Sequence, residues 1–214
     1  GYSAVGHGLG VAPAFIIGFN YNPGSINRVV YHHKIANSGV LRLDGTVALV
    51  TSQSNASYGG SYASDGGDEN PTTTTFSIGN GAWNNSGPDN MIFYCWAEIE
   101  GFSKFGIFEG NNAADGPFID CGFKPAFVLF KNIDDGVQSW PIMNSAVDTY
   151  NPVTKYLLAN DAGAETTGGI VDFTASGFKL RTDNGSFNDP ETIIFAAFAE
   201  KPFGGDGVAQ ARAR

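Results

Sequence analysis

An internal repeat constrains the fold of this chain more than any other feature of the sequence. Three pairs of apolar segments match: residues 13–17 with 125–129, 76–78 with 178–180, and 92–98 with 194–200. The last two pairs share an offset of 102 residues. Their spacing is much longer than the period of solenoids or propellers. The sequence therefore predicts two related lobes in tandem.

The repeated segments predict strands. Each apolar run lasts about five residues and is bounded by Asn, Asp, Gly or Pro, a length typical of strands and too short for stable helices. The 29 glycines and 17 phenylalanines among 214 residues suit short aromatic strands joined by tight turns. We predict an all-β fold of two related antiparallel lobes, sandwich-like or jelly-roll-like, with long loops.

The turn-rich segment 110–117 sets the predicted boundary, so residues 1–112 form the first lobe and residues 113–214 the second, including a C-terminal tail. The strand over residues 91–99 is apolar at successive positions, which predicts a strand that is covered on both faces or buried at an interface between the lobes. Trp96 and Phe198 are expected to anchor the cores.

Composition argues against several kinds of partner. The net charge of −9 disfavours nucleic acid, because phosphate binding relies on clustered Lys and Arg. No stretch reaches the ~20 consecutive apolar residues of a membrane span, so no membrane insertion is expected. Cys95 and Cys121 lie in apolar runs, where reduced thiols are favoured over one disulfide.

Motifs of catalysis and of metal binding are missing from the sequence. No Gly-x-Ser-x-Gly string occurs, and the histidines and cysteines lack zinc-ligand spacing. We therefore predict no catalysis, no cofactor and no metal site. Asp65, Asp68 and Glu69 could bind calcium, but a solvated acidic loop is the favoured interpretation.

Sugar binding is the activity that the loops suit best, because aromatic faces stack on pyranose rings while Asn and Asp bond hydroxyl groups. The candidate glycan ligands combine these residue types: Tyr58, Tyr62, Trp83, Asn84, Asn85, Asp89, Trp140, Phe187, Asn188 and Asp189. The alternative for Trp83 and Phe187 is that each ring only pins its loop against the lobe.

Several strings resemble a repeat found in the tail fibres of marine and cyanobacterial phages. They are GHGLGVAP at 6–13, AEIEGFSKFG at 97–106, DGPFI at 115–119, GFKPAFV at 122–128, YNP at 150–152, KYL at 155–157, GFKLRT at 177–182 and PFGGDGVA at 202–209. The resemblance covers nearly the whole chain. Departures cluster in residues 52–75 and 82–89, which puts a shared ligand in doubt.

This resemblance implies a structural and receptor-binding module of the virion, made in the host cytoplasm. It implies a homotrimer that contacts other tail and baseplate proteins and attaches to bacterial surface polysaccharide or lipopolysaccharide without catalysis. Three weak sites on one fibre would act together through their effective concentration. A polysaccharide depolymerase, and a lectin-like adhesin or spacer domain of a bacterial or prophage protein, are the alternatives.

Overall fold

The computed structural model describes residues 3–20, 28–35, 39–50, 70–78 and 90–200. In these ranges α1 (Gly185–Asn188) is the only helix, and all paired strands run antiparallel. No helix of these ranges has the length and apolar character needed to cross a lipid bilayer. The predicted all-β, antiparallel fold is confirmed.

Contacts along the chain define two units, Gly1–Ala97 and Glu98–Arg214. The repeat predicted the boundary after residue 112, about one strand later in the chain. The difference arises from β7 (Ser103–Glu109), which pairs with β14 (Thr192–Ala199) from Phe198 opposite Ser103 to Thr192 opposite Glu109. Pairing along its whole length makes β7 an element of the second unit.

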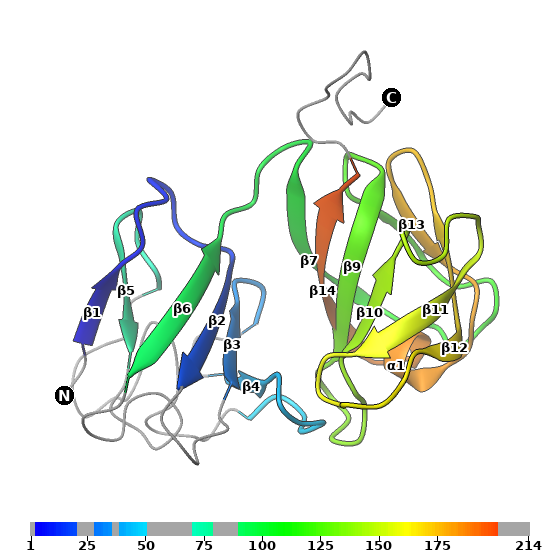
Figure 1. The fold of residues 1–214 in the computed structure, drawn as a ribbon, viewed down its shortest axis with the longest axis horizontal. Coiled ribbons are helices and arrows are strands. Elements are labelled where there is room, and N and C mark those ends of the chain that lie inside the picture. Colours follow the sequence, from blue (N-terminus) through cyan, green and yellow to red (C-terminus); the bar gives the residue numbers. More distant parts are fainter. Residues whose placement is uncertain (1–2, 21–27, 36–38, 51–69, 79–89, 201–214) are drawn as a thin grey trace. The chain divides into compact units, whose positions relative to one another are not determined.

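The first unit contains two sheets in its described part (Figure 1). The larger sheet has the order β4-β3-β2-β6, from β2 (Phe15–Asn20), β3 (Arg28–His32), β4 (Leu41–Arg42) and β6 (Met91–Trp96). The smaller sheet pairs β1 (Ser3–Gly6) with β5 (Thr75–Ile78). Side chains alternate between the two faces of each strand, so every strand offers one row to the core.

The core of the first unit lies on one face of the larger sheet, which we call the inner face. Ile16, Val29 and Tyr31 come from β2 and β3, and Phe76 and Ile78 come from β5. Phe93 and Cys95 of β6 pack against this cluster from the same face. The intervening residues of β2, β3 and β6 therefore point to the opposite, outer face.

One continuous eight-stranded sheet forms the second unit and curls into a nearly closed barrel (Figure 1). Its order is β7-β14-β9-β10-β11-β12-β13-β8, with β8 (Phe118–Asp120), β9 (Pro125–Asn132), β10 (Pro141–Asn144), β11 (Val153–Leu158), β12 (Thr166–Phe173) and β13 (Gly177–Leu180). A curled sheet encloses its core without a second stacked sheet, because its strands tilt and close around the side chains.

Phenylalanine rings fill this barrel. Phe130 and Phe178 meet edge to face, with ring centroids 5.4 Å apart, and Phe178 meets Phe195 in the same way at 5.2 Å. Gly106 faces Phe195 so closely that a Cβ atom at this position would lie 2.4 Å from the ring. Glycine is therefore the residue that lets the backbone of β7 approach the aromatic core.

The prediction that residues 91–99 are covered on both faces is wrong for β6. Ile92 and Tyr94 are 45% and 51% exposed on its outer face. Trp96, predicted as a core anchor, is only partly buried, and so is Phe198 at the matching position of β14. The central residues of β14, in contrast, are buried on both faces.

Candidate functional site

Six of the ten residues predicted to bind glycan lie outside the described residues: Tyr58, Tyr62, Trp83, Asn84, Asn85 and Asp89. The acidic loop residues Asp65, Asp68 and Glu69 lie outside them as well. The other four predicted residues belong to the second unit, where the structure gives each a position and partners.

Trp140 precedes β10 and is only 1% exposed. Its backbone N–H donates to Asn160 Oδ1 at 2.8 Å, and the Lys131 ammonium lies 5.9 Å from its ring centroid. Lys131 is fully buried and donates to the carbonyl of Gln138 at 2.6 Å. Burial lowers the pKa of Lys131 to about 8, against a smaller opposing effect of Asp135. The ring of Trp140 thus serves packing and has no face open to a sugar.

Phe187 is fully buried and closes the barrel core from α1. Its ring meets Phe130 at 5.4 Å and Tyr156 at 5.2 Å, both edge to face. The helix begins after Asn184, whose side chain accepts a hydrogen bond from Ser186 N at 3.1 Å and satisfies one free donor of the first turn. This arrangement corresponds to the packing alternative, in which the ring pins its loop.

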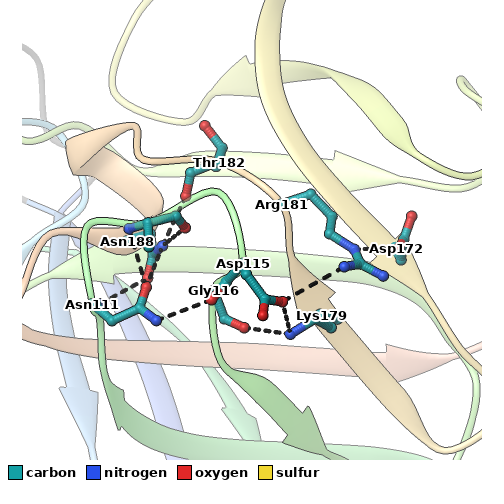
Figure 2. A network of polar contacts seen from close by, with 9 residues as sticks. Asn111, Asp115, Gly116, Asp172, Lys179, Arg181, Thr182 and Asn188 are labelled. Atoms are coloured by element: carbon teal, nitrogen blue, oxygen red, sulfur yellow. Dashed lines mark hydrogen bonds and ion pairs between the residues drawn. The ribbon is translucent and has the colours of Figure 1, made fainter.

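Asn188 is buried and holds together two segments distant in sequence (Figure 2). Its Nδ2 donates to Asn111 Oδ1, Ala113 O and Thr182 O, at 3.0, 2.8 and 2.8 Å. Its Oδ1 accepts from the backbone N–H of Asn111 at 3.0 Å. The bonds to Asn111 and Ala113 fix the loop over residues 111–116, and the bond to Thr182 holds the segment after β13. The amide is therefore occupied by the protein itself.

The same loop carries an ion-pair group at its outer side (Figure 2). Lys179 Nζ lies 2.8 Å from Asp115 Oδ1 and donates to Gly116 O at 2.7 Å, while Arg181 lies 2.7 Å from Asp172. The hydrogen bond from Lys179 holds the pKa of Asp115 below its ordinary value, with further lowering by the charges of Lys179 and Arg181. These contacts position the loop that Asn188 anchors.

Asp189, the last predicted ligand residue, is partly buried beside two further acids. One carboxylate oxygen each of Asp135, Asp189 and Glu191 lie within 4.8 Å of one another. Hydrogen bonds use several of these oxygens: Asp135 accepts from Val137 N at 3.1 Å, and Glu191 accepts from Asn132 Nδ2 at 2.6 Å. Carboxylate oxygens are the ligand type that hard cations such as Ca²⁺ prefer. In this structure the hydrogen bonds of these carboxylates stabilise two adjacent turns.

The outer face of the β3-β2-β6 sheet carries three aromatic side chains, Phe19, Tyr94 and Trp96, that are at least partly exposed. Residues directly opposite one another on neighbouring strands point to the same side. The registers of β2 with β3 and with β6 therefore place nine outer side chains in three rows: Arg28, Phe19 and Ile92; Val30, Ile17 and Tyr94; His32, Phe15 and Trp96. Of these, Val30, Ile17, His32 and Phe15 are buried.

Four of these nine residues form what we call the aromatic face: Phe19, Ile92, Tyr94 and Trp96. Tyr94 and Trp96 are stacked, with centroids 6.1 Å apart and planes inclined by 21°. Phe19 meets Tyr94 edge to face at 5.6 Å. Ile92 and Tyr94 are about half exposed, so the rings hold one another in place while Tyr94 remains open to solvent.

Arg28 borders the aromatic face at the start of β3. Its guanidinium lies 5.9 Å from the centroid of the Phe19 ring, within the range of a cation–π contact. The arginine is exposed, and its own backbone N–H donates to Asp44 Oδ1 at 3.2 Å. A partly exposed aromatic surface with a neighbouring planar cation can contact a sugar ring and bind an acceptor group of the same ligand.

In a comparison with known families, residues 1–202 match a family described as a domain of unknown function, DUF7483. The chain belongs to this family. Searches among curated proteins and among solved structures gave no match. The likeness to phage tail fibres stays a resemblance of sequence strings.

In this DUF7483 domain, sequence reasoning missed the aromatic face because β6 is apolar on both sides. Ile92, Tyr94 and Trp96 alternate with Phe93 and Cys95, which belong to the core face. A period-2 pattern is visible only when the second face is polar. The one usable signal in the sequence was side-chain size. Tyr94 of β6 matches the small Ala196 of β14 in the repeat, so a large ring stands where the other strand has a methyl group.

Both cysteines of the DUF7483 domain are free, as predicted. Burial raises the pKa of Cys95 to about 11, and burial together with the charge of Asp120 raises that of Cys121 to about 12. Thiols with such values remain protonated at neutral pH and are poor nucleophiles. Their role is to pack in the cores.

Proposed function

We propose that this DUF7483 domain is a non-catalytic attachment module of a phage tail fibre, which binds bacterial surface polysaccharide or lipopolysaccharide through the aromatic face. The observation that carries the proposal is the exposure of Tyr94 beside Trp96 and Ile92 on a regular sheet. Contiguous exposed apolar patches often mark binding sites, and the faces of aromatic rings can stack on pyranose rings.

The rigidity of the face favours ligand binding. Phe19, Tyr94 and Trp96 project from paired strands and contact one another, so their orientations are fixed before a ligand arrives. Little conformational entropy is then lost on binding. A shallow platform gives low affinity per site, which suits a fibre that presents several copies to one cell surface.

We further propose that the two units are copies of one fold, related by the sequence repeat. The pairing of Phe15 with Trp96 corresponds to that of Phe127 with Phe198, and all four residues belong to matched anchors. The pairing of Val5 with Phe76 corresponds in the same way to that of Ile119 with Phe178. The register of each strand pair is fixed independently of the others. Corresponding registers in two separate strand pairs therefore support a common origin of the two units.

Two turns support the same proposal. After β3, Lys34 N donates to His32 Nδ1 at 3.2 Å; after β10, Ala146 N donates to Asn144 Oδ1 at 2.8 Å. Before β5, Thr72 Oγ1 donates to Thr75 O, and before β13, Thr174 Oγ1 donates to Gly177 O, both at 3.0 Å. The two turn contacts of the first unit thus have counterparts in the second unit at the same sequence offsets as the repeated strands.

The proposed assembly is a homotrimer in the virion, in contact with other tail and baseplate proteins. The resemblance to tail fibres supports this part of the proposal. Light scattering on the purified chain measures the number of subunits directly, and a trimer is the expected result. Three copies would place three aromatic faces on one fibre tip and raise avidity without any change in the site.

Glycan binding by a matched pair of tyrosine variants tests the function. Tyr94→Ala removes the most exposed ring of the face, and Tyr150→Ala removes a ring that is 82% exposed in the second unit. We expect Tyr94→Ala to weaken binding to arrayed bacterial polysaccharides and lipopolysaccharides by about two- to tenfold, since one aromatic contact contributes roughly 0.5–1.5 kcal/mol. Tyr150→Ala should bind as the unaltered chain does, and equal binding by both variants would refute the proposal.

Depolymerase activity is a second candidate, favoured by the three neighbouring carboxylates of Asp135, Asp189 and Glu191. A glycosidase needs two such groups on either side of the scissile bond. Release of reducing ends from a bound polysaccharide, abolished by Glu191→Gln, would support this candidate. Binding without release of fragments supports the attachment module.

A further inference from the structure

Arg28 is positioned to recognise an anionic group beside the aromatic face. It begins β3, opposite Phe19, and its guanidinium lies over that ring at 5.9 Å from the centroid. A cation–π contact attracts the guanidinium to the ring face without an N–H···O hydrogen bond. The contact with Phe19 therefore leaves the N–H donors of Arg28 available to a ligand.

The nearest acid does not neutralise Arg28. Asp44 accepts a hydrogen bond from the backbone N–H of Arg28, and its carboxylate forms an ion pair with Arg42 at 2.6 Å. The side chain of Asp44 is 5% exposed and that of Arg42 is 23% exposed, so the carboxylate is largely withdrawn from solvent. Within the described residues, no ion pair engages the guanidinium of Arg28.

The second unit holds a cation–aromatic pair at the corresponding place, with the two residue types exchanged. Under the proposed repeat, the offset of 112 between residues 13–17 and 125–129 places Lys131 at the position of Phe19 and Trp140 at that of Arg28. The ammonium again lies 5.9 Å from the ring centroid. There the cation is buried and donates to Gln138 O at 2.6 Å. The first unit leaves its cation exposed, which is the difference expected where one copy binds a ligand and the other is structural.

We propose that Arg28 binds the carboxylate of an acidic sugar whose chain lies across the aromatic face, so that the site prefers uronic-acid-type glycans to neutral ones. This inference rests on the proposed glycan-binding function and names its ligand class. Arginine and carboxylate match as planar, two-pronged partners. Arg28 and Ile92 are separated by two strand spacings, roughly 10 Å, so a short oligosaccharide reaches from the cation to the rings.

The net charge of the chain is compatible with this preference. The charge of −9 repels polyanions at long range, but at physiological ionic strength screening is effective beyond about 8 Å. A direct contact between Arg28 and one carboxylate acts over a much shorter distance. The local group, and not the overall charge, therefore decides the selectivity.

Oligosaccharides of galacturonic acid, compared with the same oligosaccharides after reduction of their carboxylates to alcohols, test the inference by calorimetry or biolayer interferometry. We expect the unaltered chain to bind the acidic form at least about tenfold more tightly, equal to about 1.4 kcal/mol, because hydrogen bonds to charged groups are stronger than neutral ones. Arg28→Gln should abolish this preference and leave binding of the reduced form unchanged. Arg28→Lys should keep part of it, since charge remains while the two-pronged geometry is lost.

Arg181→Gln is the matched control, because Arg181 is an exposed arginine of the second unit. Equal binding of both oligosaccharides, reduced by Tyr94→Ala and unaffected by Arg28→Gln, would overturn the inference and leave the glycan-binding proposal intact. If no glycan binds and Tyr94→Ala instead changes the oligomeric state, the aromatic face is a contact between copies, and both proposals fail.

Discussion

Asn188 illustrates how one buried amide decides the structure of a loop. Its sequence context, a polar string after a strand, predicted a ligand-binding surface residue. The structure gives it four hydrogen bonds to Asn111, Ala113 and Thr182, all inside the second unit (Figure 2). An amide is equally suited to either role, because donors and acceptors are the same whether a sugar or the backbone provides the partner.

Replacement of Asn188 by alanine should therefore destabilise the second unit. Removal of the side chain leaves Asn111 N–H and the carbonyls of Ala113 and Thr182 without this partner, at a total cost of about 3 kcal/mol. Urea unfolding followed by fluorescence measures the change. Asn184→Ala, which removes a single cap bond to Ser186 N, should cost only about 1 kcal/mol. Equal effects of the two variants would contradict this assignment.

At the scale of elements, close backbone approaches explain where glycine is needed. Gly177 starts β13 opposite Asp120 of β8. A Cβ atom at this position would lie 2.0 Å from the backbone carbonyl oxygen of Ile119, far inside van der Waals contact. Backbone atoms of a paired strand cannot rotate away as a side chain can, so the two strands must separate to admit a methyl group.

Gly177→Ala should weaken the pairing of β8 with β13 and lower the free energy of unfolding by roughly 2 kcal/mol. Hydrogen exchange should show faster exchange of the β8 and β13 amides, with less change in β9 and β14. Gly163→Ala is the control, because its nearest neighbour atom, Asp161 Oδ1, lies at an ordinary contact distance of 3.4 Å. Unchanged exchange in β8 would disprove the steric argument.

At the scale of the whole molecule, the structure and the repeat divide the chain at different places. Contacts place the division after Ala97, and the repeat placed it after residue 112. The segment between them contains β7, whose Phe108 packs against Phe178 and Phe195 at 6.3 and 6.2 Å. A fragment that begins at residue 113 loses this strand and exposes the edge of β14.

Two fragments distinguish these boundaries. Residues 98–214 should unfold in one cooperative transition, because all eight strands of the curled sheet are present. Residues 113–214 should be less stable by several kcal/mol or should aggregate, since an exposed hydrophobic edge strand invites intermolecular pairing. Thermal unfolding by circular dichroism and size-exclusion chromatography measure both properties. Equal stability of the two fragments would favour the boundary predicted from the repeat.

The sequence by itself determined the structural class, because strand formation depends on local features. Short apolar runs bounded by Gly, Pro, Asn and Asp cannot form stable helices, and most of the strands lie on such runs. The free cysteines were predictable for a similar reason, since each lies inside an apolar run. The predicted matches at residues 76–78 and 178–180 both fall within strands, β5 and β13.

Only the tertiary structure decided which side chains face solvent. Phe187 enters the barrel because α1 turns back beneath β9, and no local pattern distinguishes that path from an exposed loop. Ile92 and Tyr94 remain exposed while Ile194 and Ala196, at the matching positions of β14, are buried. Burial of an apolar strand depends on whether distant segments cover its second face, and that is a property of the assembled fold.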